Sequence, residues 1–446
     1  MYKRKTVLLS VLMSLLGLTT QQSSTETLLL VIEVARHGAR SPEQFSQYNK
    51  TSVNFNDTSQ LLEGGWDQHY EIGKSLRQRL VTEQKLLSAD YSTNEVYAQA
   101  TSATRTLNST QAQLSGLFPD QAPAHKWLKA SPGTKTQGYT INQIAQADNL
   151  ITRLNEANCA KYKSAFDDVT ASAAYKRGRG YWYQTYNQTL SNLVGRPNLS
   201  ETQFDATCEY LFFSQYTNIV LNFTPTAFDR AYCSAYEDGW IYKTSFGTDQ
   251  EWKLVSYEFL NQLNEFALFL NGTRTIAQLT TFQKYFKKTA GPMPKFLLYL
   301  SHDEIMSAYL EGLGFHQPYG SFPAAGIFFE FFRDSAQNNQ IFVRTYFKQT
   351  LGETKSITLA DQTSNVISLA AFQSTIAKRI QLSGITDIAK SCAEAYVSSN
   401  TYYDPELYIT ELKQKYAADL SGISLLQSMT LKGLIMIGTM MSFSYY

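Results

Sequence analysis

The sequence has almost no excess of charge of either sign. Its 39 Lys and Arg residues nearly balance 38 Asp and Glu residues, so the formal net charge of the 446 residues is +1. Proteins that bind nucleic acid or anionic membrane surfaces commonly carry a strong basic excess. The composition therefore argues against nucleic acid as a partner, and any anion must be bound by a local cluster of positive charge.

Cysteine is also scarce, and its spacing excludes the common metal sites. The four cysteines are Cys159, Cys208, Cys233 and Cys392. None of them forms the Cys-x-x-Cys pairs typical of zinc or redox sites. An even number of separated cysteines favours two disulfides in an oxidising compartment, and the residues alone leave all three pairings open.

No apolar run reaches the roughly 20 residues that a membrane-spanning helix needs, but a shorter run lies near the N-terminus. Residues 1–22 combine a basic start with an apolar segment over 7–18 and then small polar residues. This pattern predicts a cleaved signal peptide rather than a short buried helix, and therefore a lysosomal or extracellular protein of the secretory pathway. Seven Asn-x-Ser/Thr sequons agree with that route.

The second short apolar run forms the tail 431–446. One interpretation is a lipid-anchor signal that attaches the chain to a membrane near Ser421 or Gly422 and is then removed. The other is a last helix or strand that docks on the domain. The sequence leaves both interpretations open.

The remaining chain has an ordinary globular composition, with 43% hydrophobic and 17% charged residues. Residues 27–34, 95–100 and 294–300 are typical of buried strands, and helical periodicity follows the first two. The fold class expected is α/β, with a mixed, mostly parallel sheet sandwiched by helices. We expect the core to comprise 26–121 and 290–420, and a smaller, mainly helical insertion lobe to comprise 122–289.

Chemically active side chains follow three of these expected strands. Arg36, His37 and Arg40 lie in the stretch VARHGARSP, Arg105 begins the helix after the second strand, and His302 and Asp303 follow the third. The carboxyl ends of neighbouring parallel strands meet at one edge of a sheet. We therefore expect three arginines, two histidines and one or two carboxyl groups to converge.

Such a set suits phosphoryl transfer. Guanidinium groups match a phosphate in charge and in donor geometry, and nearby positive charge favours the neutral form of His37. A neutral imidazole can attack phosphorus and form a phosphohistidine. Asp303 can protonate the leaving oxygen, and no metal or other cofactor is required.

Each of these residues alone has an ordinary structural explanation, such as a surface ion pair for an arginine or a helix cap for Asp303. Arg-His-Gly-x-Arg-x-Pro as a unit is different, because its chance occurrence in a chain of ordinary composition is on the order of one in ten thousand. The functional interpretation therefore rests on the combination.

The segment 36–42 resembles the signature of the histidine acid phosphatase family, the branch-2 histidine phosphatases. The similarity continues in LLEGGWDQHYEIGKSLRQRL, TSATRTLNSTQAQLSGLFP, LYLSHDEI and PYGSFPAAGIFFEF, and thus covers 27–120 and 290–350. The resemblance implies a phosphoglycerate mutase-like core. It also implies that His37 is the nucleophile and Asp303 the proton donor, and that the phosphate is held by Arg36, Arg40, Arg105 and His302.

Two details of the resemblance concern single residues. Some family members place the acid two residues after the histidine, which makes Glu304 the alternative proton donor. The family pattern also implies a disulfide between the insertion and the C-terminal part, for which we predict Cys159–Cys392, leaving Cys208–Cys233.

The function expected is a secretory-pathway acid phosphatase that acts on small-molecule phosphomonoesters. An inositol-polyphosphate phosphatase of the phytase type uses the same groups and is the alternative among enzymes. A non-catalytic surface binding module on the same fold is the alternative of another class. The oligomeric state stays open, with a dimer among the options.

Overall fold

The computed structural model describes most of the chain. The expected signal peptide (1–22) and the apolar tail (431–446) lie outside that part. The described residues are 25–42, 58–123, 125–127, 138–155, 157–216, 223–237, 249–286, 292–316, 321–350, 353–398, 410 and 414.

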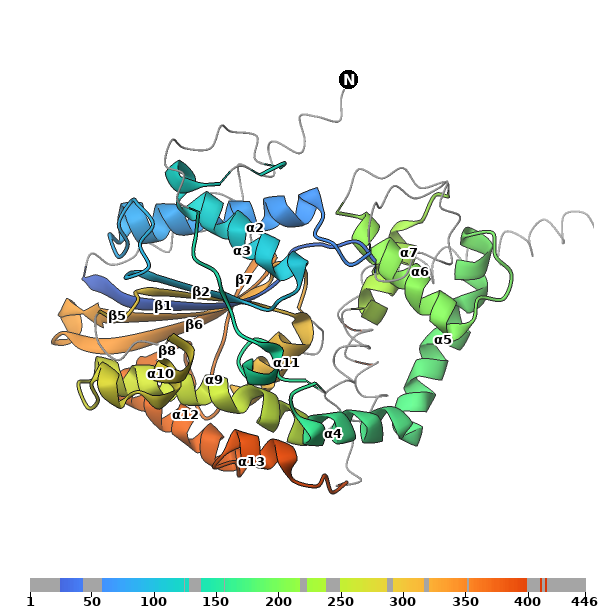
Figure 1. Ribbon diagram of the computed structural model, residues 1–446. Helices are drawn as coiled ribbons and strands as arrows, with labels where there is room; N and C mark the ends of the chain where they lie inside the picture. The colour runs from blue at the N-terminus through green and yellow to red at the C-terminus, as the bar shows by residue number, and fades with distance from the viewer. Residues whose placement is uncertain are drawn as a thin grey trace, which may run out of the picture.

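A single mixed sheet forms the centre of the protein (Figure 1). Its strands are β1 (Glu26–Arg36), β2 (Val96–Ala100), β3 (Asn142–Gln143), β4 (Phe296–Ser301), β5 (Gly326–Asp334), β6 (Gln340–Thr350), β7 (Glu353–Ser356) and β8 (Val366–Ser368). Their order is β3-β2-β4-β1-β5-β6-β7, with β8 paired to β6. Pairing is parallel from β3 to β1 and antiparallel from β1 onward.

Helices cover both faces of this sheet (Figure 1). The described α-helices are α2 (Glu63–Leu76), α3 (Thr104–Leu117), α4 (Ala160–Ala171), α5 (Ala173–Leu193), α6 (Glu201–Ser214), α7 (Ala227–Ala235), α9 (Asp249–Leu270), α10 (Thr280–Phe286), α11 (Asp303–Gly312), α12 (Leu369–Ser383) and α13 (Ile388–Ala393). Helices α2 and α3 lie on one face, and α9, α11 and α12 lie on the other. The expected α/β sandwich is confirmed.

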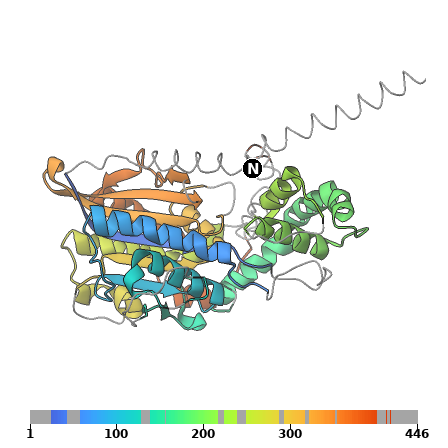
Figure 2. The ribbon, with the colours of Figure 1, turned by 90° about the horizontal axis from the view of Figure 1, so that it is seen from above.

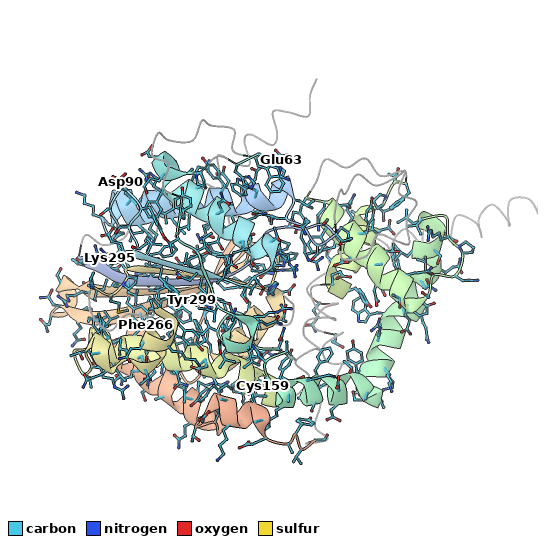
Figure 3. The ribbon with its side chains drawn as sticks, viewed as in Figure 1. Glu63, Asp90, Cys159, Phe266, Lys295 and Tyr299 are labelled. Carbon is cyan, nitrogen blue, oxygen red and sulfur yellow. A yellow bond between two sulfur atoms is a disulfide. The ribbon has the colours of Figure 1, made fainter. Side chains whose placement is uncertain are left out.

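The central strands are apolar on both faces because both faces are covered. Ile32 and Val34 of β1 belong to the hydrophobic core under α9, α11 and α12. Val31 and Ala35 belong to the core under α2 and α3. A strand buried on both sides loses the usual apolar–polar alternation, which explains the continuous apolar run at 27–32. Tyr299 of β4 lies at the centre of this packing (Figure 3).

A smaller group of helices stands to one side of the sandwich (Figure 2). Helices α5, α6 and α7 enclose a separate hydrophobic cluster that includes Trp182, Phe204 and Tyr236. Helix α9 also falls within 122–289, but it contacts α11 and α12 and contributes Phe259 and Phe266 to the core beneath the sheet. The insertion therefore supplies both the side lobe and part of a sheet-covering layer.

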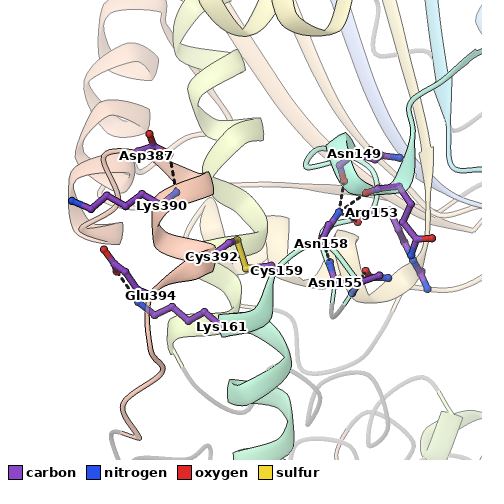
Figure 4. The surroundings of a disulfide bond; sticks show 12 residues. Asn149, Arg153, Asn155, Asn158, Cys159, Lys161, Asp387, Lys390, Cys392 and Glu394 are labelled. Atoms are coloured by element: carbon purple, nitrogen blue, oxygen red, sulfur yellow. Dashed lines mark hydrogen bonds and ion pairs between the residues drawn. A yellow bond between two sulfur atoms is a disulfide. The ribbon is translucent and has the colours of Figure 1, made fainter.

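The four cysteines form two disulfides. Cys159, just before α4, is bonded to Cys392 of α13 (Figure 4). Cys208 of α6 is bonded to Cys233 of α7 inside the hydrophobic cluster of the lobe. This is the pairing that the family resemblance implies. Among the described residues, no helix has both the length and the apolar character for a membrane span.

Candidate active site

The three functional loops meet at one edge of the sheet. Strands β2 and β1 both pair in parallel with β4, so their carboxyl ends lie side by side. Arg36 is in register with Ser301, and Ala100 with Leu300. The loops that follow these residues carry the candidate catalytic groups. The structure thus produces the convergence expected from the order of strands.

The loop after β1 is held rigidly by its neighbours. The backbone N–H of His37 donates to the Ser301 carbonyl at 3.1 Å, and the N–H of Gly38 donates to the Ser109 hydroxyl at 3.0 Å. A Cβ at Gly38 would lie 2.2 Å from the carbonyl oxygen of Gly65. Only glycine allows the loop to approach α2 so closely.

One hydrogen bond fixes the tautomer of His37. Its Nδ1 lies 2.8 Å from the Gly38 carbonyl oxygen, and because a carbonyl only accepts, Nδ1 must carry the proton. Burial, and then the positive charges around it, with Arg105 foremost, hold the pKa of His37 well below its usual range. The side chain is therefore neutral, with the lone pair on Nε2.

Arg36 and Asp303 form a buried ion pair. Arg36 Nη2 lies 2.5 Å from Asp303 Oδ2, and the two side chains are 1% and 5% exposed. Arg36 also donates through Nη1 to the Ser321 carbonyl. Burial alone would favour the protonated acid, but the Arg36 guanidinium lowers the pKa of Asp303 below its usual range. Asp303 is thus a carboxylate while the site holds no phosphate.

Glu304, the alternative proton donor, lies next to Asp303 in the first turn of α11. It forms an ion pair with Arg153. Burial and the negative charge of Asp303 raise the pKa of Glu304 to about 8, although Arg153 opposes that rise. The two adjacent carboxyl groups therefore differ in partner and in proton affinity.

Arg40 is held by the helical lobe. Its Nη1 lies 2.7 Å from Oε1 of Glu209 in α6, and its guanidinium carbon lies 4.7 Å from the centre of the Phe213 ring, one turn further along that helix. Sequence reasoning did not identify Glu209. Nothing in its neighbourhood in the sequence distinguishes it from other helical glutamates, because its partner is 169 positions away.

The second loop contributes Arg105 and a pair of threonines. Arg105 donates through Nη1 to the Ser59 hydroxyl at 2.7 Å. Thr106 donates to backbone carbonyls in its own turn, so its oxygen accepts from Thr101 at 2.8 Å. Thr101 in turn accepts from Nε2 of His302 at 3.1 Å. This row of hydrogen bonds places the His302 proton on Nε2.

The rings of His302 and His37 meet edge to face, with centroids 5.3 Å apart. Burial and the surrounding arginines, with Arg153 foremost, hold the pKa of His302 well below its usual range. Both histidines are therefore neutral before an anion binds. A phosphate between them would face the Nε2 lone pair of His37 and the ring of His302, whose proton lies on Nε2.

A buried row of polar side chains supports the motif loop from behind, and sequence reasoning did not identify it. His69 Nε2 donates to the Arg36 carbonyl at 3.0 Å, and His69 Nδ1 lies 2.9 Å from Gln113 Oε1. Gln113 Nε2 lies 2.6 Å from Glu33 Oε2. If His69 were neutral and Glu33 ionised, one contact in the row would join two acceptors with no hydrogen between them. The row therefore holds one additional proton.

The position of that proton follows from burial. Burial raises the pKa of Glu33 to about 8, with Lys348 and then Gln113 opposing the rise. Burial also lowers the pKa of His69 to about 4. We therefore expect the proton on Glu33, with the amide of Gln113 turned so that its oxygen accepts from Glu33 and its nitrogen donates to His69.

Together these groups provide a neutral imidazole nucleophile, arginines for an anion and a carboxyl group for proton transfer. The six expected residues lie where the three strands end: the three arginines and His302 surround His37, and Asp303 pairs with Arg36. Within the described ranges, no group of three or more His, Cys, Asp or Glu side chains is arranged to hold a metal ion.

Comparison with curated proteins identifies acid phosphatases as relatives. The chain is 24% identical to the lysosomal acid phosphatase of Xenopus laevis over 349 residues, which cover 78% of this chain and 75% of that protein. It is 30% identical to the testicular acid phosphatase of Homo sapiens over 179 residues, which cover 38% of this chain and 40% of that protein.

Solved structures show the same fold at lower identity. The phytase from Citrobacter braakii superposes with a TM-score of 0.55 at 16% identity, covering 81% of this chain and all of that one. The apo form of Hafnia alvei phytase gives 0.52 at 14%, covering 81% and 98%. The family model of the histidine phosphatase superfamily, branch 2, matches residues 56–348. The chain therefore belongs to branch 2 of the histidine phosphatase superfamily.

Proposed function

We propose that this protein is an acid phosphatase that hydrolyses phosphomonoesters through a covalent phosphohistidine at His37. The observation that carries the proposal is the hydrogen bond from His37 Nδ1 to Gly38. This hydrogen bond uses Nδ1 as a donor and leaves the Nε2 lone pair as the nucleophile among three arginines. The acid phosphatases among the relatives support the same reaction class.

In the first step, His37 Nε2 attacks phosphorus and the bond from phosphorus to the ester oxygen breaks. Arg36, Arg40 and Arg105 stabilise the charge on the phosphoryl oxygens. The negative charge of the bound phosphoryl group favours protonation of His302, and the imidazolium then donates to one of these oxygens. The carboxyl group of Asp303 donates a proton to the departing oxygen. In the second step, a water molecule gives one of its own protons to the Asp303 carboxylate and attacks phosphorus, and the bond from phosphorus to Nε2 breaks.

Asp303 must therefore acquire a proton when the substrate arrives. The ester brings negative charge to Arg36, which weakens the hold of Arg36 on the carboxylate and raises the pKa of Asp303. A monoester that enters with one proton, as it does below its second pKa of about 6, can supply that proton. Activity on the acid side follows from this requirement.

The test is hydrolysis of p-nitrophenyl phosphate between pH 4 and 8 by the secreted protein, beside His37→Ala. A matched control is His316→Asn, because His316 is a half-exposed histidine that pairs with Glu311 away from the site. We expect acid-side activity that His37→Ala abolishes and His316→Asn preserves. Brief reaction and denaturation at alkaline pH should trap phosphate on the wild type and on His316→Asn but not on His37→Ala.

An inactive but well-folded wild type would contradict the proposal. If neither p-nitrophenyl phosphate nor inositol phosphates were hydrolysed, the interpretation as a non-catalytic binding module would replace it. Activity on inositol phosphates alone would favour the phytase-type alternative.

We further propose how the chain is divided and where it is located. The separate hydrophobic cluster of α5 to α7 supports a side lobe within 122–289, and α9 is assigned to the phosphatase core because it packs beneath the sheet. Two disulfides and the pattern of residues 1–22 support passage through the secretory pathway. N-terminal sequencing of the secreted protein tests cleavage of the signal peptide. Membrane fractionation of the protein with and without 431–446 tests membrane attachment.

A further inference from the structure

One proposed phosphate ligand is already paired with a carboxylate that comes from outside the phosphatase core. Glu209 of α6 lies 2.7 Å from Arg40, and the two side chains are 12% and 5% exposed. At this depth the pair is poorly screened by solvent. A phosphate that binds Arg40 must therefore share its guanidinium with Glu209, and it does so next to a full negative charge.

The position of Glu209 is fixed by its helix. Cys208, the preceding residue, is bonded to Cys233 of α7. Phe213, four positions further on, lies under the Arg40 guanidinium, and Phe212 packs against Ala39 of the motif loop. The end of α6 is thus held against the catalytic loop, with Glu209 beside Arg40.

Glu209 is also the last of three carboxylates that follow one side of α6. Glu201 and Asp205 precede it at intervals of four residues, which places all three on one face of the helix. Arg179 pairs with both Glu201 and Asp205 within the lobe. Only Glu209 of the three has an ion pair with a residue of the motif loop, among the pairs that the structure describes.

We propose that Glu209 is a specificity-determining residue, which limits the negative charge that the site accepts and so favours esters with one phosphate over polyphosphorylated substrates. This inference rests on the proposed phosphatase function. Glu209 offsets the charge of Arg40 for any substrate. It also repels each further phosphate of a substrate whose first phosphate is bound at Arg40.

The size of the effect follows from the distances. A second phosphate of the same small molecule lies within roughly 10 Å of Glu209, about one Debye length at moderate salt. At an effective dielectric constant of about 20 to 40, one unit of charge at that distance changes binding by about four- to sixteenfold. The discrimination should weaken as ionic strength increases.

The decisive variant is Glu209→Gln, which keeps the shape and a hydrogen-bond acceptor for Arg40 but removes the charge. We compare kcat/KM for p-nitrophenyl phosphate and for myo-inositol hexakisphosphate at the same acid pH. Glu209→Gln should increase the ratio of the second to the first by about four- to sixteenfold. Glu201→Gln, a half-exposed carboxylate on the same helix, is the matched control and should leave the ratio unchanged.

A purely structural role predicts something else. If Glu209 only held Arg40 in place, Glu209→Gln would lower kcat/KM for both substrates by the same factor, and the inference would be overturned. Glu209→Asp keeps the charge, so it should return the ratio to the wild-type value even where the overall rate is lower. An unchanged ratio in a folded, active Glu209→Gln would equally overturn the inference.

Binding of inorganic phosphate separates this inference from the proposed function. Calorimetry should show a Kd several-fold lower for Glu209→Gln than for the wild type at low salt, whether or not either protein turns over substrate. If the wild type hydrolysed neither ester while this difference in Kd appeared, the proposed function would fail and the charge role of Glu209 would stand. Equal Kd values would overturn the charge role.

Discussion

Arg36 Nη2 and Asp303 Oδ2 are 2.5 Å apart, and neither side chain has appreciable access to solvent. The same arginine is expected to bind phosphate and the same aspartate to protonate the leaving oxygen. Because Arg36 lowers the pKa of Asp303, the acid is ionised in the empty site. Substrate binding and preparation of the acid are therefore coupled through this one contact.

The loss of activity on replacing Asp303 should depend on the leaving group of the substrate. Asp303→Asn should lower kcat for an alkyl monoester such as glycerol 2-phosphate by about 10²- to 10⁴-fold, the usual contribution of a general acid. The loss should be smaller for p-nitrophenyl phosphate, because p-nitrophenolate leaves without a proton. Steady-state rates for both esters between pH 4 and 8 provide the measurement.

Glu304→Gln is the matched comparison. With Asp303 as the donor, we expect this variant to change kcat by less than about tenfold and to leave the decline of the wild-type rate with rising pH in place. With Glu304 as the donor, the large loss would move to Glu304→Gln. The wild-type rate would then stay level to about pH 8, where the pKa of Glu304 lies.

Glu33 should make stability depend on pH. Burial raises its pKa from 4.5 to about 8 in the folded protein. The stabilisation is therefore complete below pH 4.5 and is lost as pH rises through about 8. Glu33→Gln resembles the protonated acid, so the difference in Tm between this variant and the wild type should increase in favour of the variant from pH 5 to pH 8.5.

Thermal unfolding of both proteins across that range provides the measurement. A difference in Tm that is the same at all pH values would show that Glu33 is ionised in the folded protein. In that case the additional proton of the row would lie on His69 instead, and the Gln113 amide would have the opposite orientation.

Gly38, whose loop contacts α2, should tolerate no side chain, whereas Gly180, which lies within α5, should tolerate one. The Cβ of Gly38→Ala would lie 2.2 Å from a backbone oxygen, so we expect a loss of stability above about 2 kcal/mol together with loss of activity. Gly180→Ala in α5 meets only a side-chain atom at 3.9 Å. It should stabilise the protein by about 0.5–1 kcal/mol, as urea titration would reveal; equal effects would contradict the steric explanation.

The two disulfides should differ in what their removal does. Cys159→Ala with Cys392→Ala opens a loop of 233 residues and should lower the free energy of unfolding by about 4–5 kcal/mol. Cys208→Ala with Cys233→Ala opens a loop of 25 residues and should cost about 3 kcal/mol. Only Cys208–Cys233 holds α6, so only its removal should raise KM for p-nitrophenyl phosphate. A rise in KM after removal of either disulfide would argue against that role of Cys208–Cys233.

Much of the core could be predicted from local pattern. The apolar run that ends at Arg36 predicted a strand buried on both sides, and β1 has its two faces in two hydrophobic cores. The order of strand, loop and helix predicted that Arg105 and His302 would join His37. These predictions succeed because periodicity and the geometry of parallel strands are properties of short segments.

The contacts that adjust the site could not be predicted in this way. Nothing in the local sequence distinguishes Glu209 of α6, His69 of α2 or Glu33 of β1 from other residues of helices and strands. Their partners are distant in the sequence. The extent of the lobe was also hidden, since α9 has the same kind of helical pattern as α5 but packs beneath the sheet.

The sequence by itself determined the family, the chemistry of the three loops and the α/β core, because each depends on residue type and on spacing within a segment. The tertiary structure alone decided which carboxylate faces Arg36, which one faces Arg40 and which side chains form the buried polar row behind the motif loop. Those properties depend on distances and burial between segments far apart in the chain. Charge interactions change steeply with both quantities, and neither can be obtained from residue order.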